Sequence, residues 1–413
     1  MTEGNELQNH CGIVQNMPAK TVERAKRIAI IRLTAGFCLL DIGYALSQTM
    51  LGPMVPEIQK IYGVSLAENG LLTFFQGAGG IAALLLSIFI ADMFNKKTFM
   101  AVAYTIYNIM LFLAALLPAY WLLVIIFFVI GAGTRLFDAL VNANMSEVHN
   151  EKKGFFLNLL HACFGIGALL GPVLASMVLV LYGLVAALFL IACLCAVLLG
   201  AYLLLNGKEH KRTPRQSAMA NAGQGYRLAT LLKNRTIVLL SLCTMTYVGF
   251  ATGVSMWLPS YLMDELNAGP IYAASVVSLL WAGIIAGRCV YSVFSLKFST
   301  RNLLFVSNLA GGIILVTASL INTGLSLMIG YVLSGFLIGA VVPLSVALAN
   351  KVFANCSGRI TSIIMLFASL GLTVIPAMIG VIAGRGSFRI AVLVLNLCPA
   401  LVAVLAFFIT PQK

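Results

Sequence analysis

The chain has 413 residues, of which 61% are hydrophobic and only 9% are charged, and its mean hydropathy is +1.00. An ordinary soluble domain has about 25% charged residues, so 26 basic and 13 acidic side chains are too few to cover a soluble protein of this length. The net charge of +13 would suit a nucleic-acid partner, but the basic residues lie in short gaps between apolar runs instead of on one clustered face. We therefore expect no nucleic-acid partner and predict a chain embedded in the lipid bilayer.

The chain begins with a polar tail, residues 1–31, which has no apolar signal-peptide core and is predicted to be cytoplasmic. A membrane-spanning helix needs about 20 mostly apolar residues, and twelve such runs follow. Six form a predicted N-terminal bundle (32–205), a basic linker (206–235) follows, and six form a C-terminal bundle (236–413). The predicted spans are Arg32–Val55, Asn69–Ala91, Thr98–Leu117, Trp121–Met145, Phe155–Leu181, Tyr182–Leu205, Thr236–Met263, Tyr272–Ser295, Asn302–Asn322, Leu325–Ala349, Ile360–Ala383 and Phe388–Ile409.

The distribution of Lys and Arg predicts the direction of these spans. With both termini in the cytoplasm, 21 of the 26 basic residues lie on the cytoplasmic side, and only Lys60, Arg385 and Arg389 lie outside. Basic residues in short loops are retained on the cytoplasmic side of a membrane. We therefore expect a multi-pass protein of the cell (inner) membrane with both termini cytoplasmic.

The two predicted bundles show an internal repeat. Gly167 and Pro172 in the fifth span correspond to Gly371 and Pro376 in the eleventh at an offset of 204 residues. Six spans repeated in the same orientation predict an all-α membrane fold of two six-helix bundles, related by a pseudo-two-fold axis along the membrane normal, which is typical of alternating-access transporters. Three further pairs recur at an offset of 203 or 204: Gly154 with Gly358, Pro56 with Pro259, and Gly80 with Gly283.

The loop between spans two and three reads Ile88-Phe-Ile-Ala-Asp92-Met-Phe-Asn95-Lys96-Lys97. It resembles the Gly-x-x-x-Asp-Arg-x-Gly-Arg-Arg type pattern of the major facilitator superfamily, with the acid and the basic pair kept. Asn95 replaces a glycine, and both residue types tolerate left-handed backbone geometry. The resemblance implies the major facilitator fold, and it assigns Asp92, Lys96 and Lys97 to a latch that stabilises one conformer.

Spans four and five resemble the fucose/galactose/glucose–proton symporter group. Asp138 precedes Asn142 by four residues, which matches the acid and Asn of that group, although an Asp stands where the group often has Glu and Ala143 replaces a common proline. Asn158 and His161 match the polar positions of the Leu-Asn-Leu-x-Gln/His pattern that opens span five. The resemblance implies sugar transport coupled to protons.

An ionisable side chain near the bilayer midplane costs about 2.5–3.5 kcal/mol on insertion scales, so each one requires an explanation. Asp41 lies near the middle of span one without a basic neighbour in its own helix, at the position of the symporter group's span-one acid. We predict that it takes up and releases the coupled proton; the alternative is an Asp satisfied by donors of another helix. Arg135 and Asp138 are three residues apart on one helix face and can pair. That pair is either structural or opens during proton coupling, and the spacing favours neither.

Amides and imidazoles offer donors and acceptors that suit sugar hydroxyls. Each of these groups in a span could instead form an interhelical hydrogen bond, which is common for Asn in membranes. Trp281 could present a flat face to a sugar ring, and Arg288 is the one charge deep in the second-half spans. The predicted solute-binding residues are Gln76, Asn142, Asn158, His161, Trp281 and Arg288.

The leading hypothesis is a secondary transporter that moves a sugar or a similar small polar organic solute in symport with protons, with Asp41, Asp138 and Arg135 in proton coupling. Sodium remains an alternative coupling ion, because carboxylates and amides bind either cation. The alternative function is proton-driven efflux of amphipathic compounds or metabolites. The sequence contains no catalytic set, metal-ligand spacing or phosphate-binding loop, so we expect neither an enzyme nor a cofactor. We expect a monomer.

Overall fold

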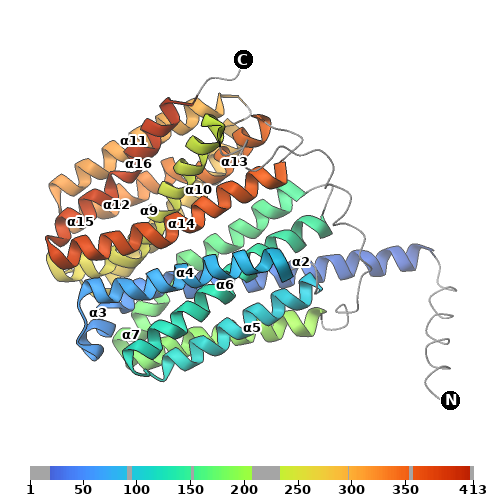
Figure 1. The fold of residues 1–413 in the computed structure, drawn as a ribbon, viewed down its shortest axis with the longest axis horizontal. Helices are drawn as coiled ribbons and strands as arrows, with labels where there is room; N and C mark the ends of the chain where they lie inside the picture. Colours follow the sequence, from blue (N-terminus) through green and yellow to red (C-terminus); the bar gives the residue numbers. More distant parts are fainter. Residues whose placement is uncertain are drawn as a thin grey trace.

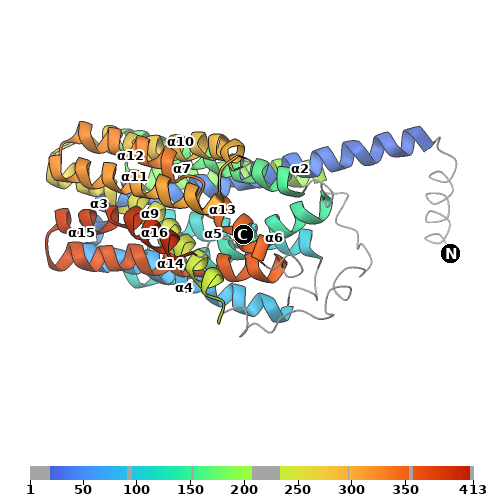
Figure 2. The same cartoon turned by 90° about the horizontal axis from the view of Figure 1, so that it is seen from above.

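The structure, a computed structural model, describes residues 19–90, 95–149, 153–206, 233–295, 297–352 and 357–409. Within them the regular structure is helical, and Figure 1 shows long helices gathered into two groups that lie side by side. Figure 2, seen from above, shows helices of both groups running along the same long axis. We call residues 19–206 the N-terminal half and residues 233–409 the C-terminal half. The helices are α2 (Ala19–Thr49), α3 (Leu51–Tyr62), α4 (Leu66–Ile90), α5 (Lys96–Ala115), α6 (Tyr120–Val148), α7 (Lys153–Asn206), α9 (Arg235–Leu266), α10 (Pro270–Phe294), α11 (Thr300–Ile321), α12 (Gly324–Ile338), α13 (Val341–Val352), α14 (Ser357–Arg385), α15 (Phe388–Asn396) and α16 (Cys398–Phe407).

The described residues contain 11 helices that are long and apolar enough to cross a membrane, and the 52-residue apolar stretch of α7 accounts for two of the predicted spans. Gly183 interrupts that stretch with φ 81° and ψ 178°, a conformation that suits glycine. Before this turn Gly171 packs on Thr49 near the end of α2. After it Asn206 reaches the carbonyl of Arg32, near the middle of α2, with its amide nitrogen 3.5 Å away. The two parts of α7 therefore run in opposite directions along α2.

Three spans that the sequence predicts as continuous are interrupted in the structure. Met50 separates α2 from α3, Gly339 and Ala340 separate α12 from α13, and Leu397 separates α15 from α16. Each interruption lies within a mostly apolar run, so hydropathy alone does not reveal it. An interrupted membrane helix leaves backbone groups that need other partners. At Gly339 the freed carbonyl accepts a hydrogen bond of 3.0 Å from Nε of Arg288.

Asn95 does not use the left-handed geometry that the sequence comparison suggested. Its φ and ψ are −66° and 120°, and its side chain accepts hydrogen bonds from the backbone N–H groups of Lys97 and Thr98. It is thus the N-cap of α5, where Asn satisfies donors that the first helical turn leaves free. Asn234 caps α9 in the same way by accepting from the N–H of Ile237.

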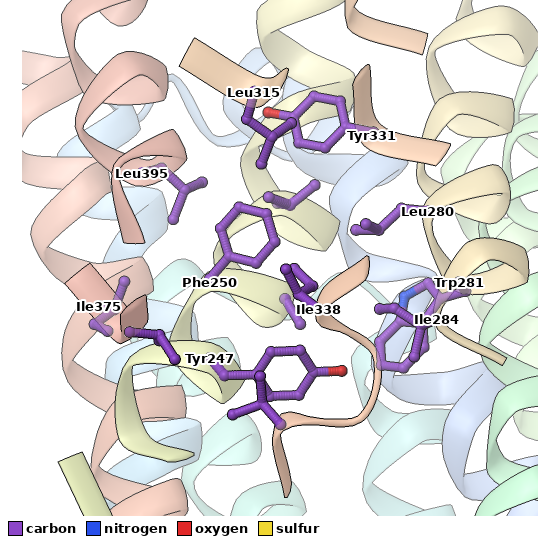
Figure 3. Packing of buried hydrophobic residues seen from close by; sticks show 14 of the residues in the cluster. Tyr247, Phe250, Leu280, Trp281, Ile284, Leu315, Tyr331, Ile338, Ile375 and Leu395 are labelled. Carbon is purple, nitrogen blue, oxygen red and sulfur yellow. The ribbon is translucent and has the colours of Figure 1, made fainter. Parts of the chain in front are cut away.

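Each half has a core of buried apolar side chains. In the N-terminal half the fully buried rings include Phe37, Tyr104 and Phe137. Figure 3 shows the core of the C-terminal half, in which Phe250 and Tyr331 lie among aliphatic side chains from several helices. Because lipid tails are as apolar as these side chains, membrane helices associate through close packing and polar contacts more than through the hydrophobic effect.

The halves meet along a contact that we call the seam, formed by α3 with α9, α4 with α14, and α7 with α10. Glycines line it. A Cβ atom added at Gly52 would overlap the backbone oxygen of Ser255, and one added at Gly77 would overlap the side chain of Thr373. The helices of the two halves therefore approach each other more closely than any larger residue at these positions would allow.

A buried polar chain joins three helices of the C-terminal half. The hydroxyl of Tyr331 donates to Oδ1 of Asn396 at 2.8 Å, and Nδ2 of Asn396 contacts the hydroxyl oxygen of Ser319 at 2.8 Å. Asn396→Leu would leave both hydroxyls buried without this partner. We expect a loss of about 1–2 kcal/mol in stability, measured as a lower melting temperature in detergent. Asn302→Leu, on the exposed face of α11, is the control and should change the melting temperature little; equal losses would contradict a specific role for the buried chain.

Candidate functional site

Asp41 lies on α2 inside the N-terminal half. Its side chain is 2% exposed, and its Oδ2 atom is buried without a hydrogen-bond partner among the described residues. Asp138 of α6 lies close enough for the charges of the two carboxyl groups to interact. Tyr44, one turn along α2, packs edge-on against Phe137 of α6 and Phe164 of α7, each with ring centroids 5.6 Å apart. Asp41 therefore faces the protein interior where α2, α6 and α7 converge.

Arg135, Asp138 and Asn142 form one polar stripe on α6. The Arg135 Nη1 and Asp138 Oδ2 atoms are 3.2 Å apart, which confirms the predicted pairing. Nδ2 of Asn142 donates to Oδ1 of Asp138 at 3.0 Å, so this amide supports the acid. The Asp138 side chain is 33% exposed and that of Arg135 15%. The carboxyl group of Asp138 is therefore the more accessible member of the pair. Gly80 of α4 makes room for the aliphatic part of Arg135.

The choice between a structural and a functional ion pair can be tested by removing one charge or both. Arg135→Gln leaves the Asp138 charge without its partner, whereas Arg135→Gln combined with Asp138→Asn removes both charges. Breaking a buried pair costs about 3–5 kcal/mol, and replacing both partners is often neutral; with partial exposure we expect about 1–2 kcal/mol for the single variant. A purely structural pair predicts that the double variant melts normally and still transports. A functional pair predicts normal melting with loss of coupled transport.

Gln76 of α4 lies at the seam. Its Nε2 atom donates to Oε1 of Gln48 on α2 at 3.1 Å, and both side chains line a cavity of about 20 Å³ between the halves, room for roughly one water molecule. Thr252 and Ser255 of α9 line the same cavity from the C-terminal half. Sequence reasoning missed these two hydroxyls, because Ser and Thr are common in membrane helices, where they usually bond to their own helix backbone, as both do here.

Trp281 of α10 does not present an open ring face. It is 8% exposed, its ring lies 5.6 Å from that of Phe164 of the other half, and its Nε1 atom donates to the hydroxyl of Ser255 at 3.1 Å. The indole thus closes the seam beside the small cavity. To stack on a sugar ring, as the sequence predicts, the indole of Trp281 would have to move away from Phe164.

His161 of α7 and Arg288 of α10 belong to opposite halves, and the Arg288 charge lies close enough to act on His161. Arg288 forms no ion pair with a carboxylate in the described part of the chain.

Among the other predicted residues, Asp92 and the side chain of Asn158 lie outside the described residues. Lys96 pairs with Glu147 at the end of α6. The latch role of Asp92, Lys96 and Lys97 stays a prediction.

His149 ends α6 beside this Lys96–Glu147 pair. Its Nε2 atom is 2.6 Å from the hydroxyl of Thr34, and its ring stacks on Phe156 with centroids 3.4 Å apart. Burial lowers the pKa of His149, so the folded protein favours the neutral ring. This contribution to stability is therefore present above the ordinary pKa of about 6.5 and is lost as the pH falls through the lower folded pKa. Between pH 7 and pH 5 we expect the melting temperature of the native protein to fall more than that of His149→Gln; equal falls would contradict this.

These features together describe a membrane protein built from two helical halves, with polar and ionisable side chains between helices in its interior and at the seam, which is the general design of a secondary transporter. The sequence matches the model of the Major Facilitator Superfamily over residues 37–290 and 240–413, and the chain belongs to this superfamily. It is a multi-pass membrane transporter and not an enzyme.

Relatives and solved structures agree with this assignment. The chain is 21% identical over 333 residues to the glucose/mannose transporter GlcP of Bacillus subtilis, a match that covers 80% of this chain and 82% of the relative. Its fold is similar to that of the nucleoside transporter NupG, with a TM-score of 0.74, 14% identity and coverage of 92% and 100% of the two chains. It is also similar to the fucose:proton symporter FucP of E. coli, with a TM-score of 0.63, 19% identity and coverage of 93% and 100%.

Proposed function

We propose that this transporter moves a sugar or a similar small polar organic solute by alternating access, in symport with protons. The observation that carries the proposal is the buried carboxyl group of Asp41, whose Oδ2 atom has no hydrogen-bond partner among the described residues and which lies beside Asp138. A lone carboxylate charge in an apolar interior is costly, and a bound proton removes that cost. Ionisable residues inside membrane proteins mark ion pathways for this reason.

Asp138 is the second proton-coupling residue in this scheme. Its carboxylate is held by Arg135 and Asn142 yet remains one-third exposed, so a proton arriving from water can compete with Arg135 for it. Protonation of Asp138 would release Arg135 and change the charge that Asp41 experiences. The two acids would then bind and release protons in a linked manner.

The nature of the solute is inferred from polar groups and from relatives. Gln48, Gln76, Thr252 and Ser255 surround the seam cavity with amide and hydroxyl groups, which suit a solute rich in hydroxyls. A glucose/mannose transporter and a fucose:proton symporter are among the similar proteins. Efflux of amphipathic compounds, the second candidate, would instead favour a wide apolar cavity.

The proposal also covers the orientation of the chain in the membrane and its oligomeric state. The excess of Lys and Arg on one side supports an inner-membrane protein with both termini cytoplasmic. We call the end of the bundle where α2, α5, α7 and α9 begin the basic end, and we propose that it faces the cytoplasm. We also propose that one chain is the working unit, because the seam lies within a single chain.

The proposal is tested with purified protein in proteoliposomes. A thermal-shift screen of sugars, nucleosides and organic acids first finds a ligand, since a ligand that binds the folded state raises the melting temperature. Uptake of that ligand is then measured with an imposed pH gradient, with an imposed sodium gradient, and with neither. Uptake that follows the pH gradient without sodium is expected. Dependence on sodium alone would change the coupling ion, and solute exit driven by proton entry would establish the efflux alternative.

A further inference from the structure

A basic pair lies across the seam on the side of the basic end. Helices α7 and α10 run antiparallel there, because α7 begins at the basic end and α10 ends at it. Phe164 contacts Trp281, and Gly165 packs against Ile285. One helical turn closer to the basic end on each helix, this register brings His161 of the N-terminal half opposite Arg288 of the C-terminal half. The effect of the Arg288 charge on His161 agrees with that placement.

The charge of Arg288 is not neutralised by the described part of the chain. Arg135 has Asp138 as its partner. Among the residues that the structure describes, Arg288 bonds only through Nε, to the carbonyl of Gly339, and forms no ion pair with a carboxylate. A guanidinium group has five N–H donors, so this bond leaves its two terminal nitrogens for another acceptor. The carbonyl of Gly339 explains how the side chain is oriented but does not balance its charge inside a membrane protein.

We propose that the transported solute carries a carboxylate, as in a hexuronic or aldonic acid, and that Arg288 binds this carboxylate with His161 as a second donor. This inference rests on the proposed function and narrows its solute class from sugars in general to sugar acids. Arg288 is suited to the task because its planar fork matches the two oxygens of a carboxylate. A neutral sugar would leave the charge of Arg288 unmatched.

The position of the pair also connects binding to movement. His161 and Arg288 belong to different halves, so one carboxylate that contacts both would stabilise the conformer in which the halves approach at the basic end. A solute drives a conformational change only as far as it binds one state better than the other. The solute carboxylate would contact both His161 and Arg288 only in that conformer, and this provides the difference in affinity between the two states.

The experiment compares two probes of equal size, glucose and glucuronate, by calorimetric titration of the purified native protein and two variants. Arg288→Gln removes the charge but keeps an amide that can donate to the carbonyl of Gly339. Arg389→Gln is the matched control, because Arg389 also contacts a backbone carbonyl, that of Leu320, but lies exposed at the opposite end of the bundle. Melting temperatures establish that each variant is folded.

We expect the native protein to bind glucuronate about tenfold or more tightly than glucose, the factor typical of a charge-assisted hydrogen bond. Arg288→Gln should lose this preference and keep its glucose affinity, whereas Arg389→Gln should behave as the native protein. Tighter binding of glucose than of glucuronate would overturn the inference and leave sugar transport standing. Binding of neither probe would contradict both the sugar proposal and the inference. If Arg288→Gln does not fold, the preference of the native protein decides, with Arg288→Lys expected to retain it.

Discussion

Asp41→Asn is expected to abolish solute uptake driven by a pH gradient while solute exchange across the membrane survives. Asn has nearly the shape of a protonated Asp but cannot release a proton, so the variant mimics one state of the cycle permanently. Exchange of solute for solute needs no net proton movement and can continue in that state. We expect the pH-driven rate to fall by about 100-fold or more, a magnitude typical of losing a proton-transferring group.

The measurement compares gradient-driven uptake with counterflow in the same proteoliposomes. Asp264→Asn is the matched control, because Asp264 is an exposed acid at the end of α9, away from the carboxyl pair, and both rates should remain near native. Equal loss of both transport modes in Asp41→Asn, with a lowered melting temperature, would mean that Asp41 is structural. Uptake that stays coupled to the pH gradient would transfer the coupling role to Asp138.

Gly52→Val is expected to stop transport by keeping the two halves apart. The added Cβ would overlap the backbone oxygen of Ser255, which belongs to the other half and cannot rotate away as a flexible side chain could. Overpacking of this kind costs about 1–3 kcal/mol, which disfavours the closed seam by a factor of about 5 to 150. We expect uptake to fall at least about tenfold.

The separation of the two halves can be measured as a longer distance between two spin labels. One label is placed at Lys60, near the end of α3, and the other at Arg385, at the end of α14. Gly200→Val is the control, because a Cβ at Gly200 meets no atom within 4 Å. Gly131→Val tests the opposite case: its Cβ would overlap the backbone oxygen of Gln76 within the same half, so it should lower stability as well as activity. An unchanged label distance and normal uptake in Gly52→Val would refute the steric argument.

Local patterns in the sequence already located much of the candidate site. The three-residue spacing of Arg135 and Asp138 places both on one face of a helix, and the structure shows them paired. The four-residue spacing to Asn142 likewise produced the observed hydrogen bond. Such predictions succeed because they depend only on the 3.6-residue period of one helix.

Contacts between helices were not readable in the same way. Three features depend on how separate helices pack: the burial of the Asp41 Oδ2 atom without a hydrogen-bond partner in the described part of the chain, the closure of Trp281 against Phe164, and the hydroxyls of Thr252 and Ser255 at the seam. No spacing within a single helix encodes such contacts. The capping role of Asn95 was missed for a related reason: a family pattern records residue type, whereas the backbone angles decide its use.

By itself the sequence determined that this protein is a twofold-repeated bundle of membrane helices with its basic residues on one side, since hydropathy, repeat offsets and charge are properties of residues in order along the chain. Tertiary structure alone decided which polar side chains meet, where helices break and how closely the halves approach. The physical reason is that helices in lipid are selected by close packing and hydrogen bonding between surfaces. Those surfaces come from residues more than a hundred positions apart, as Gly52 against Ser255 and His161 beside Arg288 illustrate.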